Sequence, residues 1–192
     1  MIEIRTATPH DSEKLNELIA FSARKLSQDY YSEPEIEGAI RYIFGVDSEL
    51  LQDKTYFVVE KDGEIAGCGG WRKRKTLFGG NQFSGRGQAI YLDPSKEAAK
   101  IRAFFIHPQF ARQGLGSQLL KYCEQQAYLQ GFTKLEMMAT LPGVKLYSAL
   151  AYEVIAEERV LLPNGLSIRF VRMLKNVNQA QPSVRVELHP DQ

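Results

Sequence analysis

The 192-residue chain has little of what metal, disulfide and membrane proteins depend on. It contains two cysteines and three histidines, and no CxxC or HExxH spacing, so no metal site is expected. No apolar run is long enough to cross a membrane, and the first residues, Met-Ile-Glu-Ile-Arg, do not resemble a signal peptide. We therefore expect a cytoplasmic protein in which Cys68 and Cys123 are reduced, buried thiols.

An excess of either charge is also missing. The 24 Lys and Arg residues nearly balance the 23 Asp and Glu residues, which leaves a net charge of +1. Neither nucleic acid nor an anionic membrane is an expected partner, because no strong positive field would attract them. Apolar residues make up 44% and charged residues 24%, as in ordinary globular proteins.

The length fits one domain, which we place at residues 1–175. Residues 176–192 are predicted to form a polar carboxy-terminal tail. Val184, Val186 and Leu188 alternate there with polar residues, so disorder, pairing as an edge strand and pairing with a second subunit are all open.

Strand and helix patterns alternate along the domain. The periodicities predict strands over 2–7, 55–60, 64–74, 100–106, 134–140, 154–162 and 167–174, and helices over 11–26, 33–44, 117–130 and 144–150. Asp62-Gly63 is a hairpin turn signal, Gly45 is expected to cap the second helix, and residues 75–98 are read as a long loop. This order predicts an α/β (α+β) fold: a mixed, mostly antiparallel sheet of about seven strands with helices on both faces.

The most informative segment is a strand that runs through a glycine turn into a helix. The turn reads Arg112, Gln113, Gly114, Leu115, Gly116 and Ser117. The first N–H groups of a helix have no partner within it, and the helix dipole adds positive charge there. Glycines allow close approach, so the segment predicts a phosphate site.

Common phosphate loops fit poorly. A Walker loop needs a lysine between Gly116 and Ser117, and a dinucleotide fingerprint needs a small residue where Leu119 stands. A nucleotide-binding protein and a glycine turn that binds nothing are the alternatives to another phosphate ligand.

Two motifs resemble those of the GCN5-related N-acetyltransferases. The turn at 112–117 is similar to motif A of that family, and Leu146-Tyr-Ser-Ala-Leu-Ala-Tyr152 is similar to motif B. The chain departs from the family pattern at Ala111, where Arg or Gln is usual, and at Ala151, where Gly is common. The resemblance covers residues 1–175 and implies the acyl-CoA N-acyltransferase fold.

The resemblance also implies acetyl-CoA as cosubstrate. The amides of 112–117 would then hold its pyrophosphate, and the backbone of Phe104, Phe105 and Ile106 would pair with its pantetheine arm and polarise the acetyl carbonyl. The arm would enter a gap between diverging parallel strands that begin near Lys100 and Lys134. The resemblance makes Tyr147 the proton donor to the thiolate.

The general base and the acceptor site are less defined. The family often has a glutamate where this chain reads Lys100-Ile-Arg-Ala103, so Glu136, His107 and a water relay are the candidates. Arg72 and Arg74 share one face of a strand, where they are either a solvated edge or a site for an acidic group of the acceptor.

The resemblance therefore predicts an N-acetyltransferase that acetylates a primary amine by direct attack in a ternary complex. The acceptor would be a small molecule or a peptide. A homodimer is open, because dimers are common in the family. The alternative is a non-catalytic acyl-CoA-binding or regulatory module on the same fold.

Overall fold

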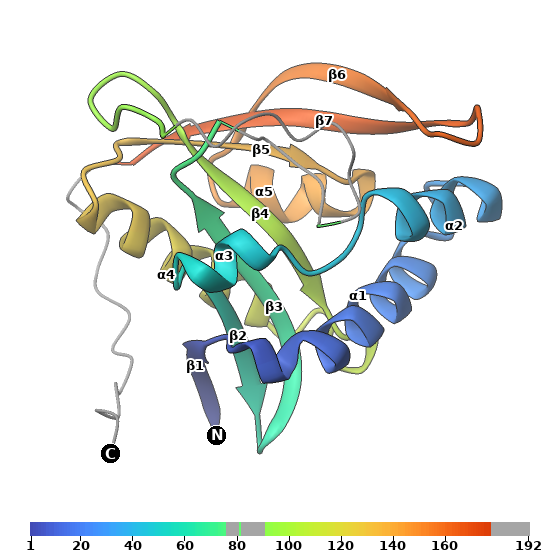
Figure 1. Cartoon of the computed structure of the whole chain (residues 1–192), viewed down its shortest axis with the longest axis horizontal. Coiled ribbons are helices and arrows are strands. Elements are labelled where there is room, and N and C mark those ends of the chain that lie inside the picture. Colours follow the sequence, from blue (N-terminus) through green and yellow to red (C-terminus); the bar gives the residue numbers. More distant parts are fainter. Residues whose placement is uncertain (76–80, 82–90, 178–192) are drawn as a thin grey trace.

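The computed structural model describes residues 1–75, 81 and 91–177. Its centre is a seven-stranded sheet in the order β1-β2-β3-β4-β5-β7-β6 (Figure 1). Of the strands in the described ranges, only β4 and β5 run parallel to each other, so the predicted mixed, mostly antiparallel sheet is confirmed. The strands are β1 (Ile2–Thr6), β2 (Tyr56–Lys61), β3 (Glu64–Arg72), β4 (Ala99–Ile106), β5 (Lys134–Ala139), β6 (Glu153–Leu161) and β7 (Ser167–Asn176).

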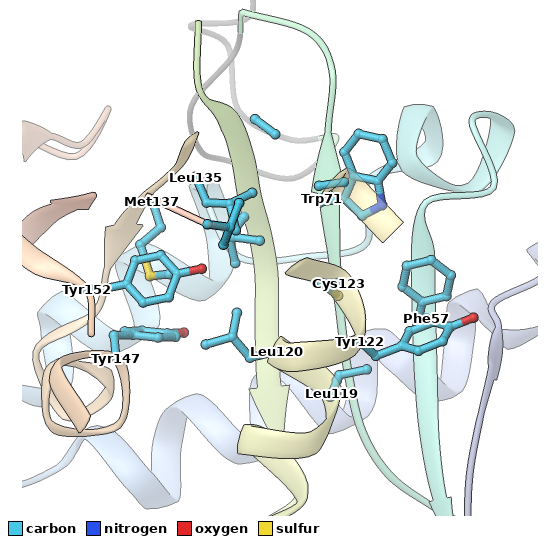
Figure 2. Close-up of a cluster of buried hydrophobic side chains, with 14 of the residues drawn as sticks. Phe57, Trp71, Leu119, Leu120, Tyr122, Cys123, Leu135, Met137, Tyr147 and Tyr152 are labelled. Carbon is cyan, nitrogen blue, oxygen red and sulfur yellow. The ribbon is translucent and has the colours of Figure 1, made fainter. Parts of the chain in front are cut away.

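Helices cover both faces of the sheet, as the alternating pattern predicts. The helices are α1 (Ser12–Ser27), α2 (Glu33–Tyr42), α3 (Ser48–Gln52), α4 (Leu115–Leu129) and α5 (Val144–Ala149). One face packs against α1, α2 and α3 through Leu15, Leu50 and Ala39. The other face packs against α4 and α5, where Leu119, Leu120 and Tyr147 join one apolar core with Leu135 and Met137 (Figure 2).

Local signals place most of these elements. The apolar stripe Leu15, Leu18, Ile19 and Ser22 is buried along α1. Ser32 and Glu35 form a reciprocal capping box at the start of α2. The Asp62-Gly63 turn has positive φ at both residues, 53° and 83°, as a two-residue hairpin requires.

Some predicted boundaries are wrong. Gly45 does not cap α2, which ends at Tyr42 with Ile43 as its cap. The short helix α3 was not predicted, because five residues are too few to show a period. β3 ends at Arg72, and beyond it Arg74 makes only an isolated bridge with Tyr91.

Two predicted segments fall mainly outside the described residues: most of the loop at 75–98, and the tail beyond Val177. The last described residue still belongs to the fold, since its N–H donates to the carbonyl oxygen of Thr133 over 2.8 Å.

Both cysteines are buried free thiols on the predicted elements, Cys68 on β3 and Cys123 on α4. Burial raises the pKa of Cys68 to about 12 and that of Cys123 well above its ordinary value. Within the described residues, no helix has the length and apolarity that a membrane crossing needs. No group of three or more metal-ligating side chains gathers among these same residues.

Candidate functional site

The parallel neighbours β4 and β5 diverge along most of their length. They pair only at Ala99 with Leu135 and at Lys100 with Glu136. The predicted gap between the strands that begin near Lys100 and Lys134 is therefore confirmed. A strand edge without a neighbour presents backbone N–H and C=O groups, so the gap is suited to an extended ligand.

A bulge at Ala103 shapes the wall of this gap. The pairing with β3 passes from Arg102–Gly70 to Phe105–Cys68, which leaves one extra residue on β4. Ala103 takes up the irregularity with a φ of 49°, and its carbonyl oxygen accepts a hydrogen bond from the Tyr56 hydroxyl over 3.2 Å. The bulge thus changes the direction of β4 where this strand borders the gap.

The backbone beyond the bulge faces alternately toward and away from β3. The His107 N–H donates to the carbonyl of Ala66 over 2.8 Å, which directs residue 107 toward β3. The backbone groups of Ile106 and Phe104 therefore point away from β3, because direction alternates along a strand. Ser22 on α1 confirms this direction, since its hydroxyl donates to the Ile106 carbonyl over 2.8 Å.

The glycine turn leads into α4, and Gly114 stands at its N-cap. Gly114 has a φ of 82°, which suits glycine, and Arg112, Gln113 and Gly114 are exposed. Among the residues that the structure describes, none accepts a hydrogen bond from the amides of 112–117. A cluster of N–H donors without acceptors among the described residues thus lies at a helix N-terminus and is available to an anion.

Lys61, which the sequence did not single out, reaches this turn from the β2–β3 hairpin. Its ammonium donates to Oε1 of Gln113, and Nε2 of Gln113 donates to the carbonyl oxygen of Gln109 over 3.0 Å. Lys61 lies 52 positions earlier in the chain. It therefore adds a positive charge beside the turn that no local sequence signal indicates.

A pocket lies in the gap between β4 and β5. Its walls come from the loop after α2 at 43–45, from β4 at 101–105, and from Met137, Met138, Thr140, Tyr147 and Phe170. Phe44 packs edge-on against both Phe105 and Phe170, with ring centres 5.3 and 6.3 Å apart. Apart from Arg102, the described residues around the pocket are uncharged.

Tyr147 forms part of the pocket wall. Its side chain is buried beside Tyr152, with ring centres 6.1 Å apart (Figure 2). Burial raises the pKa of Tyr147 well above its usual value, so the hydroxyl keeps its proton. Gly143 gives the ring its space, since a Cβ there would lie 2.7 Å from Cε2 of Tyr147.

Arg72 and Arg74 do not form the solvated edge that the sequence allowed. Arg72 is 1% exposed and forms ion pairs with Asp47, at 3.5 Å, and with Glu49. Arg74 forms a two-point ion pair with Asp53, with contacts of 2.8 and 2.9 Å. All three acids lie on or next to α3, so the unpredicted helix supplies the ion-pair partners of these two arginines.

Arg102 belongs to the same buried network. Its Nη2 lies 3.2 Å from Oδ2 of Asp47, which is itself completely buried. The sequence did not single out Arg102 or Asp47. They are 55 positions apart, and nothing local to either predicts the contact.

Neither candidate base lines the pocket. Glu136 is buried and forms ion pairs with Lys100 and Arg172. Burial raises the pKa of its carboxyl, but these two cations outweigh that effect and the pKa lies below its usual range. The imidazole Nδ1 of His107 accepts from the Gln109 N–H over 3.3 Å, and its ring packs against Phe21. This geometry does not favour Glu136 as a base.

Comparisons with known proteins agree with this architecture. The sequence profile of the acetyltransferase (GNAT) family matches residues 20–152. No curated protein matches the sequence.

Solved structures share the fold at low sequence identity. A GCN5-related N-acetyltransferase from Rhodopseudomonas palustris is 16% identical with a TM-score of 0.64, over 91% of this chain and 94% of that one. The PaiA N-acetyltransferase of Thermoplasma acidophilum, in complex with coenzyme A, is 16% identical with a TM-score of 0.62, over 92% and 99%. A GNAT acetyltransferase from Brucella melitensis, in complex with acetyl-CoA, is 14% identical with a TM-score of 0.55, over 98% and 96%. With its profile match over more than half of the chain, the protein belongs to the GNAT family of acetyltransferases.

Proposed function

We propose that the protein transfers the acetyl group of acetyl-CoA to a primary amine by direct attack in a ternary complex. The observation that carries this proposal is the β4–β5 gap, which has outward-facing amides of the α4 N-terminus near one end and the pocket beside Tyr147. Family membership supports acetyl transfer, and two of the similar structures hold coenzyme A or acetyl-CoA.

The amides of 112–117 are the proposed site for the diphosphate. They are donors without protein acceptors among the described residues, and the α4 dipole adds positive charge. Lys61 lies beside the turn and would add to the attraction.

The backbone of Phe104, Phe105 and Ile106 is the proposed partner of the pantetheine arm. Since the backbone groups of Phe104 and Ile106 face the gap, an N–H there can polarise the acetyl carbonyl. Such a preorganised donor is worth about 3 kcal/mol in the transition state.

Tyr147 is the proposed general acid. The amine nitrogen forms a bond to the acetyl carbon, the carbon–sulfur bond breaks, and the Tyr147 hydroxyl gives its proton to the leaving sulfur. The amine attacks in its neutral form and then gives up one proton to water, which passes a proton back to the Tyr147 oxygen and restores the hydroxyl. Glu136 is disfavoured as the base because its carboxylate is held in ion pairs.

The pocket limits the acceptor. Its apolar walls favour an apolar group next to the amine and disfavour a second charge there, because none of the described residues lining the pocket is an acid that could pair with a second cation. We therefore propose as acceptor a small-molecule or peptide primary amine without a second cation close to the reacting nitrogen.

The decisive experiment measures thiol release from acetyl-CoA with a set of amines, next to calorimetric binding of coenzyme A. Binding together with amine-dependent release is the expected result. Binding without release from any amine would instead identify a non-catalytic acyl-CoA-binding module. No binding at all would contradict the proposal.

A further inference from the structure

A buried hydroxyl and a buried thiol meet at the bulge in β4. The Tyr56 hydroxyl on β2 donates to the carbonyl oxygen of Ala103 over 3.2 Å, and the Cys68 thiol on β3 donates to the same oxygen over 3.9 Å. Tyr56 and Cys68 are completely buried in the apolar core that packs against α1 and α3. Two buried donors therefore converge on one backbone acceptor beside the gap.

Both donors keep their protons at neutral pH. Burial raises the pKa of Tyr56 well above its ordinary value and the pKa of Cys68 to about 12. A protonated hydroxyl donates well and a protonated thiol donates weakly. The Tyr56 hydroxyl is thus the stronger of the two contacts to the Ala103 carbonyl, and it is also the shorter.

The backbone of Ala103 needs such support. With a φ of 49°, this alanine lies in the left-handed region, which residues other than glycine rarely occupy. A backbone conformation of this kind persists only where the surroundings fix it, and such conformations cluster at functional sites. The two side-chain hydrogen bonds fix the carbonyl end of the residue.

The opposite face of the sheet supports the bulge through Phe104. The ring of Phe104 lies on Gly69 of β3, where a Cβ would stand 2.2 Å from Cδ2 of the ring. Phe104 packs against the core that includes α4 and α5, whereas Tyr56 and Cys68 belong to the core on the other face. The peptide that joins Ala103 to Phe104 is therefore supported from both faces.

A fixed carbonyl also fixes the amide that follows it. The C=O and N–H groups of a trans peptide point in opposite directions, and none of the described peptide bonds is cis. The Ala103 carbonyl points toward Tyr56 and Cys68, so the Phe104 N–H points away from them. This direction leads into the gap, since the backbone groups of Phe104 face away from β3.

We infer that Tyr56 and Cys68 are positioning residues, which fix the Ala103 carbonyl and thereby direct the Phe104 N–H toward the acetyl carbonyl of the cosubstrate. This role rests on the proposed function, because that function places the acetyl group in the gap. A donor that is oriented before the reaction needs no reorganisation in the transition state. Loss of this orientation should therefore lower the rate of transfer more than the affinity for coenzyme A.

Tyr56→Phe removes only the hydroxyl. It should lower kcat for thiol release by about tenfold, the rate equivalent of one hydrogen bond, and change coenzyme A affinity by less than about twofold. Cys68→Ala should lower kcat by about threefold, because a thiol is a weak donor. Tyr122→Phe is the matched control with normal kcat, since buried Tyr122 packs instead against Phe57, with ring centres 4.8 Å apart (Figure 2).

Nuclear magnetic resonance tests the same role without turnover. In the ligand-free protein, Tyr56→Phe should shift the carbonyl carbon resonance of Ala103 upfield, and Tyr122→Phe should leave it in place. In the wild type, acetyl-CoA should shift the Phe104 amide proton downfield relative to coenzyme A, because only acetyl-CoA brings an acetyl oxygen to this N–H. Tyr56→Phe should reduce that difference.

These measurements distinguish this role from the proposed function. A folded Tyr56→Phe variant with normal kcat, an equal loss in Tyr122→Phe, or an Ala103 resonance that does not move would each overturn the positioning role. A wild type that acetylates no amine would overturn the proposed function, and the Ala103 and Phe104 resonances would still decide whether Tyr56 directs the amide. Thermal unfolding identifies the folded variants, and Cys68→Ala provides the second variant for the same carbonyl.

Discussion

Asp47 holds Arg102 at the wall of the pocket, with Oδ2 and Nη2 3.2 Å apart and both side chains almost fully buried. The same carboxylate lies 3.5 Å from Nη1 of Arg72. One buried acid at the N-cap of a short helix therefore fixes two arginines of neighbouring strands. The contact links the stability of the sheet to the charge of the pocket.

Asp47→Asn should lower the free energy of unfolding by about 3 kcal/mol, because it leaves two buried guanidinium groups without this charge. Glu37→Gln is the matched control, since it removes an ion pair with Arg24 in which both side chains are nearly half exposed. It should cost less than about 1 kcal/mol. Urea denaturation measures both, and equal losses would contradict the prediction.

Tyr147→Phe should lower kcat by about a hundredfold, the usual contribution of a positioned acid, and leave coenzyme A affinity unchanged. Tyr128→Phe is the control, because Tyr128 packs against the same core but does not line the pocket. Steady-state kinetics and calorimetry separate the two effects. A Tyr147→Phe enzyme with normal kcat would exclude Tyr147 as the proton donor.

Gly114→Ala should weaken coenzyme A binding by about tenfold, the value of one charge-assisted hydrogen bond. Gly63 is a close match, since its φ is 83° against 82° for Gly114 and a Cβ at either position meets nothing within 4 Å. Both alanine variants should lose about 1 kcal/mol of stability from backbone strain. Only Gly114→Ala should affect calorimetric affinity, and an equal effect of Gly63→Ala would refute a local role for the turn.

Amines of similar length should differ in kcat/KM according to the charge at their far end. Butylamine should be acetylated with a kcat/KM about tenfold or more above that of 1,4-diaminobutane, because the apolar pocket offers the second cation of the diamine no acidic partner among the described residues. In 4-aminobutanoate the far end carries a carboxylate, which would also have to leave water, so this amine should be a poor acceptor as well. The rate of thiol release gives all three values, and a preference for the diamine would contradict the apolar pocket as the acceptor site.

Stability should depend on Asp11 in acid. The hydrogen bond from Arg5, together with those from Thr8, lowers the pKa of Asp11 from 3.8 to about 2, although partial burial opposes the shift. The folded pKa is lowered, so the stabilisation is fully present above the unfolded value of 3.8 and is lost as the pH falls toward about 2.

Asp11→Asn should therefore cost about 1–2 kcal/mol near neutral pH, a value reduced because Arg5 is one-third exposed. The difference from wild type should shrink as the pH falls below the unfolded pKa. Urea denaturation at several pH values measures it, and a constant difference would count against the Arg5–Asp11 pair.

The sequence predicted the elements whose signals are local. The stripe on α1, the Asp62-Gly63 turn and the strand–glycine–helix segment each lie within a few residues, whereas the divergence of β4 and β5 was expected only from the family resemblance. The burial of Arg72 could not be predicted in this way, because its partners Asp47 and Glu49 lie at the N-cap and in the first turn of α3, more than twenty positions earlier. The bulge at Ala103 could not be predicted either, because an alanine in the sequence does not indicate a positive φ.

Two residue pairs, Ala99–Leu135 and Lys100–Glu136, make up the strand pairing between the first four strands and the last three. The two halves of the sheet are therefore joined through β4 and β5 at one end of these strands only, at Ala99 and Lys100. A molecule bound in the gap between the two strands contacts both halves of the sheet, so the mechanical stiffness of the protein should rise when the gap is occupied.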